Sequence, residues 1–109
     1  MAYDAALADR LLAATSGLPQ VTTRKMFGGF AVMWRGNMLA GVTGDDLMVR
    51  VGPDGFEEAL AQPGAQEMMF TGKSMRGMVT VRADHLATED QVARWVERAV
   101  AFVQTLPAK

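Results

Sequence analysis

The sequence predicts an α+β domain of two layers, in which an antiparallel five-stranded sheet carries helices on one face. Three observations support this fold class. Apolar residues recur at helical spacing near both ends of the chain, short apolar runs alternate with glycine-containing turns between them, and 109 residues, 50% of them apolar, suit a single domain over residues 1–109. The expected order is helix, three strands, helix, two strands, helix.

The first expected element is a helix over residues 4–16. Its apolar stripe includes Leu7 and Leu11, Asp4 is placed to cap its start, and Gly17, with a proline two positions later, ends it. We expect the helix to bury this stripe in the core.

Three strands should follow as a meander over 30–34, 38–43 and 47–51, with turns at the RGN and GDD sequences. The first strand, FAVMW, is apolar on both sides, and Met48 and Met78 are expected to share its outer face. Such a face needs a cover. We expect a homodimer to provide it, and a chain terminus folded across the sheet is the alternative.

The second half of the chain should contain a helix, two strands and a final helix. We expect the short helix over 53–62, strands over 68–70 and 78–82, and a glycine-rich turn over 71–77. Thr88 and Gln91 form a capping-box pattern at the start of the final helix, whose wide apolar stripe includes Trp95.

Composition excludes several classes of function. The formal net charge of -1 provides no overall field that would concentrate nucleic acid or draw the chain to an anionic membrane. No cysteine is present, which excludes disulfides, thiolate nucleophiles and zinc–thiolate sites. The N-terminal residues carry neither a basic leader nor a long apolar run, so we expect a cytoplasmic protein.

The stretch RKMFGGF, residues 24–30, is the strongest local motif. Its glycines and cations are the groups that cradle phosphates, but they precede a strand and match no phosphate-loop spacing. We therefore expect an architectural role, in which Gly28 and Gly29 bend the backbone at the start of the strand and Met26 and Phe27 turn inward as anchors. Anion binding is the alternative.

Few residues offer other chemistry. The single histidine, His85, lies before the final helix without metal-ligand spacing around it, so we expect it to end a strand or contact the helix start. Neither Ser16 nor Ser74 lies in a nucleophile elbow. We expect no catalytic residue, cofactor or metal. A small enzyme or ligand-binding domain, with a pocket between the middle helix and residues 71–77, is the alternative.

These motifs together resemble the TfoX/Sxy N-terminal domain family, whose signature is an R-x-MFGG motif leading into a β-meander. The matching residues are Arg24 and Met26 to Gly29, then MLAGV, DLMVRV and the FTG sequence at 70–72. The resemblance implies a fold like that of secretion-chaperone-like domains. Full-length members regulate natural competence and carry a second, C-terminal helical domain. The printed sequence ends directly after the final helix, so we expect a single-domain member without that C-terminal TfoX domain.

We therefore expect a non-enzymatic protein-interaction module, in a regulatory setting, that binds an unidentified protein partner. A transcription or competence regulator that contacts nucleic acid is the second hypothesis. Its expected contacts are basic residues from three parts of the chain: Arg24, Lys25, Lys73, Arg76 and Arg82.

Overall fold

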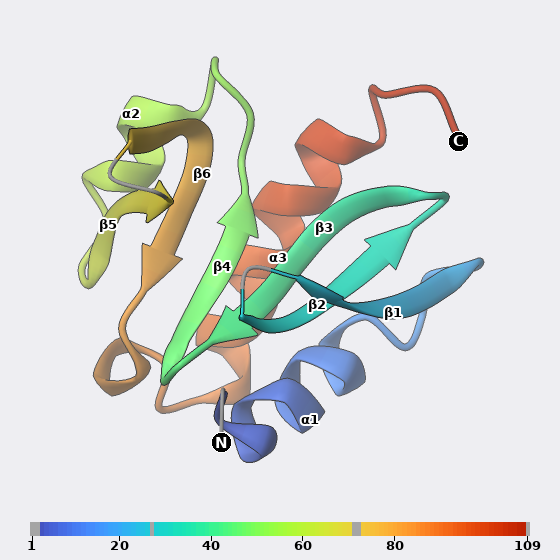
Figure 1. The fold of residues 1–109 in the computed structure, drawn as a ribbon, viewed down its shortest axis with the longest axis horizontal. Helices are drawn as coiled ribbons and strands as arrows, with labels where there is room; N and C mark the ends of the chain where they lie inside the picture. Colours follow the sequence, from blue (N-terminus) through green and yellow to red (C-terminus); the bar gives the residue numbers. More distant parts are fainter. Residues whose placement is uncertain (1–2, 27, 71–72, 109) are drawn as a thin grey trace.

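The computed structural model describes residues 3–26, 28–70 and 73–108, with the side chains of all of these except 26, 69, 70 and 73–76. It is an α+β fold with one antiparallel sheet and three α-helices (Figure 1). The elements are α1 (Ala5–Ala14), β1 (Val21–Met26), β2 (Gly29–Trp34), β3 (Asn37–Thr43), β4 (Asp46–Arg50), α2 (Phe56–Leu60), β5 (Ala65–Phe70), β6 (Lys73–Val81), the 3-10 turn η1 (Ala83–His85) and α3 (Glu89–Val103).

The sheet has six strands in the order β1-β2-β3-β4-β6-β5. The predicted fold class is confirmed, but the prediction of five strands missed β1, which pairs with β2 along the whole of 21–26. Residues 22–25 are polar and exposed, so this edge strand lacks the apolar alternation that identifies strands in a sequence. Figure 1 shows β1 and β2 running at a steep angle to β4 and β6, as the twist of a large sheet requires.

All three helices pack on one face of the sheet and enclose the main core. Leu11 from α1, Phe56 from α2 and Val96 from α3 meet Val49 and the neighbouring strand residues there. The predicted caps form as expected: the Asp4 carboxylate accepts from the N–H groups of residues 6 and 7, and α3 begins with a complete capping box. These local caps set where each helix starts and therefore which stripe faces the sheet.

The opposite face of the sheet carries a second apolar cluster, the methionine layer. It consists of Ala31, Met33, Met38, Met48, Met68 and Met78, so the expectation that Met48 and Met78 share a face is confirmed. These side chains are only 0–8% exposed in the single chain. A homodimer is therefore not needed to remove this layer from water, and self-association stays a prediction without that support.

The second half of the chain differs from the predicted boundaries in two places. The middle helix is shorter than the expected 53–62 and spans Phe56–Leu60. The predicted turn over 71–77 is wrong for its larger part, because β6 begins at Lys73. Gly77 lies inside that strand with φ +91°, and its carbonyl accepts from the N–H groups of Val51 and Gly52. A glycine irregularity within a strand has the same sequence pattern as a turn.

The glycines of the RKMFGGF motif lie at the hairpin between β1 and β2. Met26 pairs with Gly29, and Gly28 between them has φ +72°. A Cβ on Gly29 would lie 2.0 Å from the Val42 carbonyl oxygen, so only glycine fits between β2 and β3. Phe27 and the side chain of Met26 lie outside the described residues, and their role as anchors stays a prediction.

The longest helix, α3, has 15 residues. No helix in the described part of the chain combines the length and the apolar content needed to cross a bilayer.

Candidate functional site

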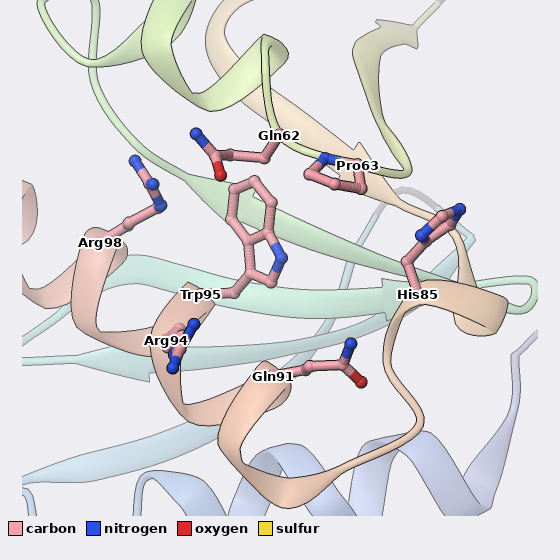
Figure 2. A pocket seen from close by; sticks show the side chains of 7 residues that line it. All are labelled: Gln62, Pro63, His85, Gln91, Arg94, Trp95 and Arg98. Carbon is pink, nitrogen blue, oxygen red and sulfur yellow. The ribbon is translucent and has the colours of Figure 1, made fainter.

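A hollow with a partly polar lining lies between the end of α2, η1 and α3 (Figure 2). Its volume is about 260 Å³. Seven side chains line it, and no carboxylate is among them: Gln62, Pro63, His85, Gln91, Arg94, Trp95 and Arg98. We call this the His85–Trp95 pocket. It brings together three segments of the chain: the loop after α2, η1 and α3. Pro63 and His85 are more than twenty residues apart in the sequence.

Helix α3 supplies one wall of this pocket through residues spaced three and four apart. Gln91, Arg94, Trp95 and Arg98 therefore fall on one side of the helix. The orientation of Gln91 is fixed by the capping box, because its Oε1 accepts from the Thr88 N–H at 2.9 Å. This leaves the amide nitrogen free to donate, and Figure 2 shows it turned toward the hollow.

Trp95 forms the floor, and the residue is only 7% exposed. Its indole nitrogen donates no hydrogen bond to any described residue, and Figure 2 shows it on the edge of the ring that faces His85. The other tryptophan, Trp34, also lacks a partner for its indole nitrogen within the described residues, but that atom is fully buried. The two indole N–H groups therefore differ in their access to solutes.

The opposite wall comes from the loop after α2. Gln62 donates from Nε2 to the Glu58 carbonyl at 3.1 Å, so its Oε1 is left as a free acceptor beside the pocket. The ring of His85 packs on Gly64, where an added Cβ would lie 2.6 Å from the imidazole. Gly64 has φ +80°, which also favours glycine. The loop path thus leaves room for the histidine ring.

The two arginines of the pocket are held differently. Arg98 forms an ion pair with Glu58 at 3.3 Å, and its guanidinium lies 5.4 Å from the centre of the Trp95 ring. Arg94 is exposed and forms no ion pair with any described residue. The Nε2 atom of His85 lies 4.0 Å from the Asp84 carboxylate. Arg94 is therefore the cation whose charge is free to meet a ligand.

A group of acidic residues lies close to η1 without forming a metal site. Partial burial raises the pKa of the Asp46 carboxyl above its usual value, and the negative charges of Asp45 and Asp84 raise it further, whereas Arg82 lowers it. Within the described ranges, no three histidine or carboxylate side chains gather closely enough to hold a metal ion.

The basic residues expected to contact nucleic acid are not brought together where the structure describes them. In the register of β1 with β2, Arg24 lies opposite Ala31 on the methionine face, and Lys25 lies opposite Phe30 on the helix face. Arg82 follows β6, four strand positions from β1, or roughly 19 Å across the sheet. It also pairs with Asp84 at 3.6 Å. The side chains of Lys73 and Arg76 lie outside the described ones.

A second surface feature is a shallow apolar groove between the end of α1 and the outer side of α3, of about 500 Å³. We call it the α1–α3 groove. Most of its lining residues are small or apolar, and two are polar: Ala14, Gly17, Leu18, Ala93, Val96, Glu97, Val100, Ala101 and Gln104. Glu97 is exposed and forms no ion pair with any described residue.

Sequence reasoning assigned no ligand role to the residues of the His85–Trp95 pocket. His85 was expected to act structurally, and Trp95 was expected only as part of an apolar stripe. The alternative pocket beside residues 71–77 shares with the observed one only its place at the middle helix. The one local signal was the spacing of Gln91, Arg94 and Arg98, which places three long polar side chains along one side of α3.

Comparison with known proteins identifies the family. The model of the TfoX N-terminal domain matches residues 13–103, which is most of the chain and includes every strand. No curated protein and no solved structure matched the chain. The match contains the glycine hairpin that joins β1 to β2 as well as α3, the helix that forms one wall of the pocket. The chain belongs to the TfoX N-terminal domain family.

Proposed function

We propose that this chain is a non-enzymatic protein-interaction module that binds a helical segment of a partner protein in the α1–α3 groove. The observation that carries the proposal is the lining of this groove, in which Ala14, Gly17, Ala93 and Ala101 leave an open apolar channel on the helix layer. Amphipathic helices bind other proteins by placing their apolar side chains in grooves of this kind. The regulatory role of full-length TfoX/Sxy proteins favours a regulatory setting for the module.

The groove also defines the chemistry of its occupant. Small side chains on the groove walls allow a partner helix to approach closely and to insert large aliphatic or aromatic side chains over Val96 and Val100. Glu97, which forms no ion pair within the described part of the chain, offers a carboxylate in the same lining, so a lysine or arginine beside the apolar side chains of the partner would complement it. The expected partner segment is therefore a basic amphipathic helix.

Site-specific photo-cross-linking in the native cell tests this proposal. A photoreactive amino acid at Ala101, in the groove, should give a protein adduct of defined mass, and the same group at Glu57, exposed on α2, should not. Adding the substitution Ala93→Arg to the variant with the photoreactive group at Ala101 should remove the adduct, because the arginine fills the groove. It should not lower the thermal stability of the domain.

Three outcomes would contradict the proposal. The adduct could persist in the Ala93→Arg variant, or it could form equally at Ala101 and Glu57, in which case the groove would not be the binding surface. It could also have the mass of two copies of this chain or contain nucleic acid, and then the occupant would be a second copy or a polynucleotide instead of a partner helix.

A further inference from the structure

We propose that the His85–Trp95 pocket binds a small molecule that carries an oxyanion, a carboxylate or a phosphate, with the anionic group at Arg94 and the body of the molecule against Trp95. This inference is independent of the α1–α3 groove. The pocket lies at the N-terminal part of α3 and the loop after α2, whereas the groove lies between α1 and α3.

The charge balance of the pocket favours an anion. Its lining contains two guanidinium groups and an imidazole but no carboxylate. Two carboxylates lie just outside the lining: Asp84 is 4.0 Å from His85, and Glu58 pairs with Arg98. Arg94 has no acidic partner among the described residues. An unpaired guanidinium binds carboxylate and phosphate oxygens through charge-assisted hydrogen bonds, which are stronger than those between neutral groups.

Two neutral donors lie beside that charge. The capping box holds Gln91 so that its amide nitrogen has no acceptor among the described residues, and the indole N–H of Trp95, on the edge facing His85, likewise has no partner among them. Figure 2 shows both nitrogens directed into the space between α3, Pro63 and His85. Both donors are rigidly placed, because Gln91 belongs to a helix cap and Trp95 is a buried residue, only 7% exposed. Fixed donors lower the ordering cost of binding.

The remaining lining residues of the pocket indicate the chemistry of the rest of the ligand. The Trp95 ring and Pro63 provide apolar contact, and Gln62 leaves its Oε1 free to accept one hydrogen bond from a hydroxyl or amine. The volume of about 260 Å³ lies just below the range of about 300 to 1,000 Å³ that is typical of pockets for drug-sized molecules. A small organic acid or phosphate monoester therefore fits this pocket better than a dinucleotide.

The two tryptophans provide an internal control for the test. In a ¹H–¹⁵N spectrum each indole N–H gives one signal, and Trp95→Phe identifies the signal from the pocket. Titration with benzoate, and separately with inorganic phosphate, should move the Trp95 signal along a saturating curve and leave the Trp34 signal unchanged, since that indole nitrogen is buried. Comparing the two titrations shows whether a carboxylate or a phosphate is preferred.

Matched variants connect binding to the proposed cation. Arg94→Gln should weaken binding of the better probe by about tenfold, the effect of losing one hydrogen bond to a charged group. Arg24→Gln, which removes an exposed cation from β1, should leave the affinity unchanged. The proposal is wrong if neither probe moves the Trp95 signal at roughly 10 mM, if both indole signals move together, or if Arg94→Gln binds as well as the wild type.

Discussion

Gly29 provides the sharpest test of the idea that the R-x-MFGG motif serves architecture. The substitution Gly29→Ala would place a methyl carbon 2.0 Å from the Val42 carbonyl oxygen and 3.0 Å from the Thr43 Cα, whereas ordinary contact begins at 3.4 Å. Both neighbours are backbone atoms of β3, so no side-chain rotation can relieve the overlap. The strands β2 and β3 would have to separate by about 1.4 Å at this point.

The expected loss of stability follows from this displacement. Overpacking in a well-packed region costs about 1–3 kcal/mol, and each strand hydrogen bond broken costs about 0.5–1.5 kcal/mol more. Alanine restricts the unfolded chain relative to glycine, which returns about 0.4–1 kcal/mol. With one strand hydrogen bond broken, the middle of these ranges gives a net loss of about 2 kcal/mol, out of the about 5–15 kcal/mol that stabilises a domain of this kind.

Urea unfolding followed by circular dichroism measures this loss. At the m-values of about 1–3 kcal/mol/M that are typical of small proteins, a loss of about 2 kcal/mol should lower the urea midpoint by roughly 0.7–2 M. Gly17→Ala is the matched control, because no atom lies within 4 Å of the added Cβ, and its stability should stay within about 0.5 kcal/mol of the wild type. If Gly29→Ala is as stable as Gly17→Ala, the close approach of β2 and β3 is not what requires glycine here.

Three further predictions concern the core, a helix cap and a carboxyl group. Leu47→Ala should lower the free energy of unfolding by about 2–5 kcal/mol in a denaturant titration, because Leu47 is fully buried in the main core. Thr88→Ala should lower it by about 1 kcal/mol in the same assay, because the Thr88 hydroxyl caps α3. The pKa of Asp46 is raised in the folded chain, so its ionisation reduces stability as pH rises above the usual value of 3.8 for this carboxyl group. Asp46→Asn should therefore stabilise the domain at neutral pH, and this gain should shrink as pH falls toward 3.8 in unfolding measured across pH; a gain independent of pH would contradict the assignment.

The sequence was sufficient for the elements whose signals are local. The capping residues Asp4 and Thr88, the stripe on α3 and the hairpins around the RGN and GDD turns were all predicted where they occur. Each depends on residues a few positions apart, so the chemistry that determines the structure is visible without knowledge of the rest of the chain.

The edge strand β1 and the start of β6 were not predictable in this way. Residues 22–25 are exposed on both faces, and only their pairing with β2 makes them a strand. Gly77 resembles a turn residue, but its positive φ is accommodated inside β6 by hydrogen bonds from Val51 and Gly52. In both places the partner strand determines the conformation, which propensity alone cannot show.

The candidate pocket was hidden for a related reason. Gln62, His85 and Arg94 come from three elements, and their separation in the sequence has no motif spacing. The close packing of the His85 ring on Gly64 brings two of these elements together. It depends on the positive φ of Gly64, which cannot be predicted from the sequence alone. Only the α3 wall, with its helical spacing, could have been found in advance.

The methionine layer allows transient opening of the sheet to be followed by methionine oxidation. Met48 has no exposed surface, so peroxide can convert its thioether to the sulfoxide only while the strands around it are transiently apart. The rate of that oxidation, compared with the rate for free methionine, would report how often the helix-free side of the sheet opens to solvent.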